Sequence, residues 1–114
     1  MSKYNSKKIT REGITFDSKK EYERFRVLKS MEKAGKIEDL QRQVEFVLLP
    51  SQKDPITKRV IERPVKYIVD FTYWKNGEYI AEDVKGYRGG TAYAVFVIKR
   101  KLMLYMHGIK VREV

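Results

Sequence analysis

The sequence predicts an α/β (α+β) protein with a single domain, in which a mixed sheet lies between helices. Three observations predict this class. Residues 18–33 and 91–107 repeat apolar side chains at helical spacing, and residues 37–49 and 65–74 alternate as strands do. Asn76-Gly77 separates two β-rich runs, which is typical of a hairpin. The resulting order is helix, strand, strand, strand, helix, strand, and 114 residues suffice for one core.

The composition indicates a polyanionic partner. The formal net charge is +10, a strong field for a small chain, and nucleic acid (DNA above all) is the partner that we expect. The absence of cysteine excludes disulfides, zinc–thiolate sites and a thiol nucleophile. No segment is typical of a signal peptide or a transmembrane span, and no helix resembles a membrane-surface anchor. We therefore expect a cytoplasmic protein.

Residues 1–12 are predicted to form a basic N-terminal arm ahead of a domain at residues 13–114. The stretch 1–11 contains no acidic residue and is not expected to hold fixed structure by itself. Either it is a solvated tail or Lys7, Lys8 and Arg11 contact phosphates, and we favour phosphate contact because the rest of the chain carries the same charge sign.

The first helix is predicted to begin after an N-cap at Asp17 or Ser18 and to run to about residue 33, before Gly35. Its core face is built from side chains at helical spacing: Tyr22, Phe25, Leu28 and Met31. Glu21 leans toward that buried side, whereas Glu23 is expected to be exposed. Glu21 has two competing roles, the capping box with Ser18 and an acidic metal ligand.

The next strand, at residues 37–49, leads into a polar, basic connection at residues 50–63. This connection is either a long β-hairpin loop or a flap, and Lys58 and Arg59 are expected to grip a DNA backbone. Gln43 lies in the strand, but its spacing assigns it no role.

The hairpin register follows from a two-residue turn at Asn76-Gly77. Lys75 then faces Glu78, and counting outward places Phe71 opposite Glu82 and Asp70 opposite Asp83. Lys85 shares the side of Asp83 because side chains alternate along a strand. The two carboxylates either surround a divalent cation, for which Mg²⁺ or Mn²⁺ suits oxygen ligands, or form a solvated pair neutralised by Lys85.

The strand at residues 65–74 is expected to keep one apolar face throughout, formed by Val65, Tyr67, Val69, Phe71 and Tyr73. Its other face carries Asp70 among further apolar side chains. The middle of the sheet is therefore expected to be covered on both sides, with the acidic patch half-buried.

The glycine-rich segment 86–90 is expected to face the substrate, with Arg88 on a phosphate and Tyr87 stacking on a base. Thr91 is the expected N-cap of the last helix. Its expected core stripe is Val95, Ile98, Leu102 and Tyr105. Lys99 borders that stripe and offers a positive group to DNA. His107 ends the helix without a partner for a catalytic triad.

Asp70, a hairpin and then Asp83-Val84-Lys85 resemble the signature of the PD-(D/E)XK nucleases, with Val69 in place of the usual proline. The stretches ITREGITFDSKKEYERF and VDF…EDVKG resemble a family of small phage and prophage proteins related to Holliday-junction resolvase-like nucleases. The resemblance implies a restriction-endonuclease-like αβββαβ core. It also implies Mg²⁺ or Mn²⁺ held by Asp70, Asp83, the Val84 carbonyl and Glu21.

The expected function is that of a Mg²⁺-dependent endodeoxyribonuclease, with Asp70, Asp83, Lys85 and Glu21 as its catalytic residues. No base-reading element is evident, so cutting directed by DNA structure, as at branches or junctions, is favoured in phage recombination or processing. A homodimer would suit junction cutting, although no sequence feature indicates one. The alternatives are a nucleic-acid-binding accessory protein with a silent nuclease-like site and a protein that acts through protein partners.

Overall fold

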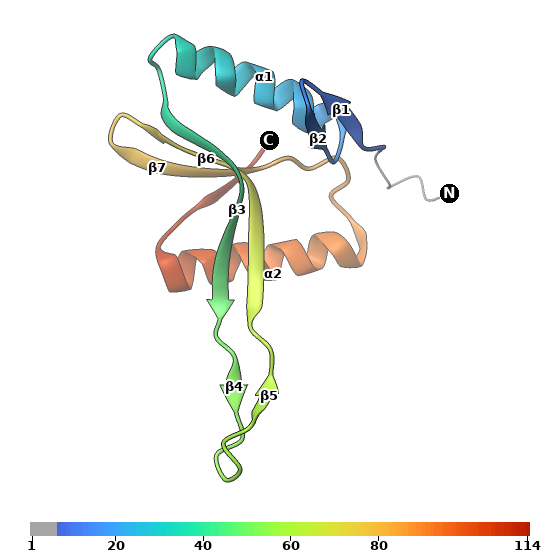
Figure 1. The fold of residues 1–114 in the computed structure, drawn as a ribbon, viewed down its shortest axis with the longest axis vertical. Coiled ribbons are helices and arrows are strands. Elements are labelled where there is room, and N and C mark those ends of the chain that lie inside the picture. The colour runs from blue at the N-terminus through green and yellow to red at the C-terminus, as the bar shows by residue number, and fades with distance from the viewer. Residues whose placement is uncertain (1–6) are drawn as a thin grey trace.

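The computed structural model describes residues 7–114 and has the predicted αβββαβ core, in which a mixed four-stranded sheet lies between two helices (Figure 1). The elements are β1 (Ile9–Arg11), β2 (Ile14–Phe16), α1 (Lys19–Lys33), β3 (Glu38–Leu49), β4 (Gln52–Lys53), β5 (Val60–Glu62), β6 (Val65–Lys75), β7 (Glu78–Asp83), α2 (Gly90–His107) and β8 (Val111–Glu113). The predicted fold class is confirmed.

The sheet has the order β3-β6-β7-β8, with β3, β6 and β7 antiparallel and β8 parallel to β7. The predicted hairpin register is confirmed from Lys75–Glu78 to Phe71–Glu82. Asn76 and Gly77 have φ of 51° and 77°, the positive values that a type I′ turn requires. Return of the chain through α2 to a parallel strand places Glu113 beside Asp83.

Helix α1 is capped as the sequence predicts. The Ser18 hydroxyl accepts a hydrogen bond from the backbone N–H of Glu21 at 3.1 Å, and the left-handed Gly35 (φ 74°) follows the last turn. Phe25 and Leu28 pack with Phe16 into a core between α1 and the sheet. This packing fixes the N-terminus of α1 beside the end of the β6–β7 hairpin.

The predicted core stripe of α2 is wrong at three of its four residues, and only Leu102 packs against the core. Val95, Ile98 and Tyr105 are exposed, and the helix instead buries Phe96 and Met103 against the other face of the sheet. The helix is apolar on most of its circumference, so two stripes have helical spacing and periodicity alone cannot select one. The helix also begins one residue before Thr91, after an N-cap at Gly89.

The prediction of one continuous apolar face on β6 is also wrong. Tyr67 and Val69 pack in the core under α2, whereas Phe71 and Tyr73 pack in the core under α1. The change occurs at Asp70, and the burial of β6 agrees with it, since Phe71, Thr72 and Tyr73 are buried in succession. Strict alternation of buried and exposed side chains therefore ends at Asp70.

The prediction that residues 1–11 lack fixed structure is wrong for Ile9–Arg11, which pairs with Ile14–Phe16 in a short antiparallel hairpin. Ile9 and Ile14 pack against the core under α1, which explains the ordering. The expected domain boundary at residue 12 falls within this hairpin. Residues 1–6 of the predicted arm lie outside the described residues.

Residues 50–64 form a β-hairpin, one of the two forms expected for this connection. Strands β4 and β5 continue β3 and β6 away from the domain as a narrow arm (Figure 1). Among residues 7–114, no helix is long and apolar enough to cross a membrane.

Candidate active site

A cleft of about 940 Å³ opens where the N-terminus of α1, the β6–β7 hairpin and the first half of α2 meet. Five acidic residues and five lysines line it: Asp17, Glu21, Glu45, Asp70 and Asp83, with Lys8, Lys20, Lys66, Lys85 and Lys99. The predicted catalytic residues therefore share one cavity. The lysines would attract a phosphate backbone, and the carboxylates would hold a cation beneath it.

Asp70 and Asp83 lie together just beyond the last pair of the β6–β7 ladder, as predicted. Asp83 Oδ1 accepts a hydrogen bond from the backbone N–H of Asp70 at 3.1 Å. Asp70 Oδ2 accepts one from the N–H of Val84 at 2.8 Å. Each carboxylate is thus fixed by the backbone of the other strand, which holds both in a defined position.

Burial, followed by the nearby charge of Asp83, raises the pKa of Asp70 to about 8. Asp83 itself is only 4% exposed. A proton or a cation relieves the crowding of these two groups, because like charges at short range in a poorly solvated site disfavour ionisation. The pair is therefore suited to release a proton when a divalent cation binds.

Lys85 is held beside Asp83 on the side of the cleft formed by α2. Its ammonium lies 3.0 Å from Asp83 Oδ2 and 3.9 Å from the centre of the Phe96 ring. The Tyr67 hydroxyl donates to the same Asp83 oxygen at 2.7 Å. Burial and the charge of Asp83 raise the pKa of Tyr67, so this phenol stays protonated as a donor. The Phe96 ring thus holds the Lys85 ammonium beside Asp83, and the Tyr67 hydroxyl orients the Asp83 carboxylate.

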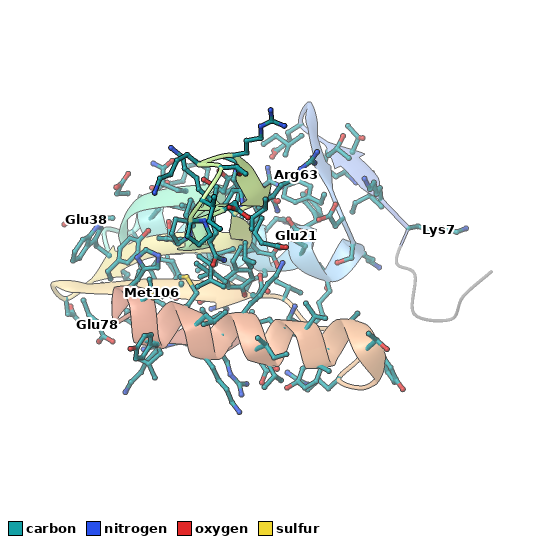
Figure 2. The ribbon with its side chains drawn as sticks, turned by 90° about the horizontal axis from the view of Figure 1, so that it is seen from below. Lys7, Glu21, Glu38, Arg63, Glu78 and Met106 are labelled. Atoms are coloured by element: carbon teal, nitrogen blue, oxygen red, sulfur yellow. The ribbon has the colours of Figure 1, made fainter. Side chains whose placement is uncertain are left out.

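Glu21 is 2% exposed and points into the middle of the molecule, whereas Lys7, Glu38 and Glu78 lie at its periphery (Figure 2). Its Oε2 accepts a hydrogen bond from the N–H of Asp17 at 3.2 Å, one residue before the expected capping partner Ser18. Burial and then the charge of Asp17 raise the pKa of Glu21. Glu23 is exposed, as predicted.

Gln43 connects Glu21 to Asp70. Its side-chain amide lies 3.2 Å from Glu21 Oε1 and 3.4 Å from Asp70 Oδ1, and Arg42 approaches the same Glu21 oxygen at 3.3 Å. The left-handed backbone of Gln43 costs about 1–3 kcal/mol in a residue other than glycine. Backbone strain beside two acidic groups indicates that Gln43 positions them.

The donor set fits a divalent metal ion. Asp17, Glu21 and Asp70 each offer an oxygen atom, and these atoms all lie within 4.8 Å of one another. An all-oxygen set of carboxylates is the kind that Mg²⁺ and Mn²⁺ prefer. Asp83, a predicted ligand, is not in this group, and its Oδ2 contacts Tyr67 and Lys85 instead. Val84, the other predicted ligand, lines the cleft.

The predicted nucleic-acid contacts are distributed over three regions. Lys8 and Lys99 line the cleft, while Lys7 and Arg11 are exposed on the N-terminal segment and do not line it. Lys58 and Arg59 lie at the end of the β4–β5 arm. Two further predicted contacts, Tyr87 and Arg88, lie in the loop before α2.

In that loop, Arg88 Nε lies 3.7 Å from Oε1 of Glu113 of β8, so its guanidinium has an acidic partner within the protein. The Tyr87 ring lies against Gly89, where an added Cβ would come within 2.7 Å of the hydroxyl. A larger residue at position 89 would therefore displace the Tyr87 ring from this position. Gly86 lines the cleft, so the start of the loop faces the site.

Sequence reasoning missed four residues of the site: Asp17, Gln43, Tyr67 and Phe96. Asp17 could have been found once Ser18 was assigned as the N-cap, because it then stands directly before the cap and four residues before Glu21. Tyr67 was hidden by its assignment to the apolar face of its strand, and Phe96 lies outside the predicted core stripe of the last helix. Gln43 gives no local signal, since its role depends on a backbone distortion.

The comparisons with known proteins bear on the family alone. No curated protein and no solved structure matches the chain. Residues 1–113 match the family DUF1064, which is described as "Protein of unknown function". Because the match extends over almost the whole chain, the protein belongs to this family.

Proposed function

We propose that this protein is a metal-dependent endodeoxyribonuclease that hydrolyses phosphodiester bonds in branched or junction DNA. One observation carries the proposal. Asp70, Asp83, Lys85 and Glu21, which the resemblance to PD-(D/E)XK nucleases marks as catalytic, line one cleft and are connected by hydrogen bonds or ion pairs to its walls. The net charge of +10 and the lysines around the cleft support a nucleic-acid substrate.

The reaction is the attack of a water oxygen on phosphorus, with a new P–O bond formed as the P–O bond to the leaving deoxyribose oxygen breaks. The attacking water gives up a proton, and the leaving oxygen takes one. Lys85 orients the water or neutralises the developing charge at the phosphate, and Asp83 with Phe96 holds its ammonium in place. Lys99 and Lys8 hold the adjacent phosphates.

Mg²⁺ or Mn²⁺ would be held by Asp70, Glu21 and Asp17, and when bound it would lower the pKa of a water molecule and offset charge on the phosphate. Gln43 keeps Glu21 and Asp70 at their present separation by contacting both. Asp83 contributes by holding Lys85 and by raising the pKa of Asp70.

A nucleic-acid-binding protein without cleavage is the second candidate. It is favoured by the contacts of Asp83, whose two oxygens are both engaged by protein donors and lie outside the Asp17–Glu21–Asp70 group. Such a carboxylate would serve stability equally well, because buried charges need partners.

The test is cleavage of labelled branched, duplex and single-stranded DNA with Mg²⁺ or Mn²⁺, with wild type beside Asp83→Ala. We expect metal-dependent cutting of the branched DNA that is lost in the variant, while salt-sensitive binding remains. Binding without cutting by wild type would support the second candidate. Neither cutting nor binding would favour a role with protein partners.

A further inference from the structure

The β4–β5 arm has features that the cleft does not explain. It continues β3 and β6 beyond the sheet and projects from the domain, so that the molecule is 55 Å long (Figure 1). A two-stranded ribbon has no core and gains little stability by itself. A projecting, ordered ribbon is therefore best explained by contact with another molecule.

The tip of the arm is a defined structure. The Asp54 carboxylate accepts hydrogen bonds from the N–H groups of Ile56 and Thr57 at 2.8 and 2.9 Å. The backbone of Asp54 also pairs with Arg59 and Lys58 at 2.8 and 2.9 Å. These bonds close the turn and lower the pKa of the Asp54 carboxyl. The position of Ile56 is thus fixed before any partner binds.

The side chain presented at this tip is apolar. Ile56 is 89% exposed, and Val60 and Ile61 on β5 are 56% and 60% exposed. Isolated apolar side chains on a surface need no explanation, but here three lie on one thin ribbon with a closed turn at its end. Of the three, only Ile56 lies in the closed turn, so it is the apolar side chain at the tip of the arm.

The charge around the tip indicates what covers it. The arm carries four basic residues, Lys53, Lys58, Arg59 and Arg63, all exposed. Of its two acidic residues, Asp54 is used by the turn. A second copy of this basic chain would meet the same charge, which disfavours a contact between two arms. A polyanion complements it.

The arm is also continuous with the cleft. Glu45, Lys66 and Ile68 on β3 and β6 line the cleft wall, and the same two strands run on into the arm. A nucleic acid seated in the cleft would therefore follow these strands toward the tip. In known modes of DNA binding, basic ribbons lie in a groove and an apolar side chain enters between base pairs.

We propose that the arm is a DNA-binding ribbon whose tip residue, Ile56, inserts between bases at a branch point, while Lys58 and Arg59 hold the flanking phosphates. Bases at a branch are already partly unstacked, so insertion costs less there than in continuous duplex. This inference deepens the proposed nuclease function, because it supplies the preference for branched DNA, but DNA binding by the arm does not require cleavage.

The experiment uses the full chain in EDTA, so that no cutting occurs, and DNA with 2-aminopurine at a branch point. We expect wild type to raise the fluorescence of the probe as the base unstacks, and Ile56→Ala to abolish most of that rise. Ile56→Ala should also reduce the preference for branched over linear DNA about 5-fold or more. The matched control Ile61→Thr, on the same ribbon but away from the tip, should retain both properties.

Three results would overturn the inference: an equal fluorescence rise with Ile56→Ala, absence of DNA binding by wild type, or a concentration-dependent change in mass that Ile56→Ala abolishes, which would assign the tip to a second copy. Cleavage of the same DNA with Mg²⁺ is measured separately. If wild type does not cut but shows the Ile56-dependent signal, the nuclease proposal is contradicted and DNA binding by the arm is supported. If wild type cuts without that signal, the nuclease proposal is supported and insertion of Ile56 is contradicted.

Discussion

At the scale of single residues, the acidic groups of the site are held together by a small number of side chains. Gln43 contacts both Glu21 and Asp70, and it does so with a backbone conformation that is unfavourable for glutamine. Asp70 is buried enough for its pKa to rise to about 8. The cost at Gln43 is one of backbone conformation, whereas the cost at Asp70 is one of buried charge, which a bound metal ion would relieve.

Replacement of Asp70 by asparagine should stabilise the metal-free protein at alkaline pH. The pKa of Asp70 rises from 3.8 when unfolded to about 8 when folded, so between these values the folded state binds a proton that the unfolded state lacks. Stability therefore falls as pH rises from about 4 to about 8. Asp70→Asn should remove this fall, with a gain of about 1–3 kcal/mol at pH 8.

Urea unfolding in EDTA at pH 5 and pH 8 measures this effect. The exposed neighbour of Glu21 supplies the control, since Glu23→Gln should leave the pH dependence as in wild type. Mg²⁺ should stabilise wild type and not Asp70→Asn. Equal pH dependence of stability in all three proteins would show that Asp70 is not the group whose raised pKa lowers stability at alkaline pH.

Glycine at position 43 should separate strain from function. Gln43→Gly relieves the left-handed backbone and should raise the free energy of unfolding by about 1 kcal/mol, while it removes the amide that contacts Glu21 and Asp70. Metal affinity should therefore fall. Asp39, with φ 54° on the same strand, is the matched control: Asp39→Gly should stabilise without affecting metal binding.

Thermal unfolding with and without Mn²⁺ reports both properties. If Gln43→Gly bound Mn²⁺ as tightly as Asp39→Gly, Gln43 would be only a structural irregularity of β3.

At the scale of elements, α1 is attached to the sheet by a buried ion pair. Arg24 makes two hydrogen bonds to Glu82 of β7, at 2.8 and 2.6 Å, and the Tyr73 hydroxyl donates to the same carboxylate. Glu82 is 1% exposed. Burial and this hydrogen bond raise the pKa of Tyr73 to about 12. Because α1 carries Glu21, this ion pair also fixes the position of the Glu21 carboxylate in the cleft.

Arg24→Met should therefore destabilise the protein by about 3–5 kcal/mol, because Glu82 is left buried without its cation. Replacement of all three partners, Arg24→Met with Glu82→Leu and Tyr73→Phe, should recover most of that loss. Chemical unfolding compares these with Lys29→Met, which breaks the exposed Lys29–Glu32 pair on the same helix and should cost less than about 1 kcal/mol. A similar cost for both single substitutions would contradict a structural role of the buried pair.

The elements also show what the sequence could and could not predict. The β6–β7 register was predictable because Asn76-Gly77 permits one turn geometry, and the start of α1 because Ser18 and Glu21 form a local motif. The buried face of α2 was not predictable, since both of its faces are apolar. The change of face at Asp70 was not predictable either, because the alternate residues of β6 are apolar on both sides of it.

The same limit applies to the candidate site. Asp70, Asp83 and Lys85 are close in the chain or opposed across a hairpin, so counting residues brings them together. Asp70 joins Asp17 and Glu21 only through the packing of α1 against the sheet. Contacts of this kind belong to tertiary structure, where spacing along the chain gives no guide.

At the scale of the whole molecule, a net charge of +10 is arranged around an acidic cleft. Lys99 and Lys101 on α2 test this arrangement because they are two residues apart, and only Lys99 lines the cleft. Lys99→Ala should weaken DNA binding and reduce the slope of log affinity against log salt by about 0.9, the value for one phosphate contact. Lys101→Ala should change the slope less. Fluorescence anisotropy at several salt concentrations measures both, and equal slopes for the two variants would argue against binding in the cleft.

The central claim is that the acidic cleft is a metal-dependent nuclease site, and single-turnover cleavage of branched DNA by wild type, Asp70→Asn and Glu23→Gln tests it most directly. We predict Mg²⁺-dependent cutting by wild type and Glu23→Gln, and a loss of at least about 100-fold in Asp70→Asn, as expected when a group that stabilises the transition state is removed. Cutting by Asp70→Asn at the wild-type rate, or cutting that persists in EDTA, would contradict the claim.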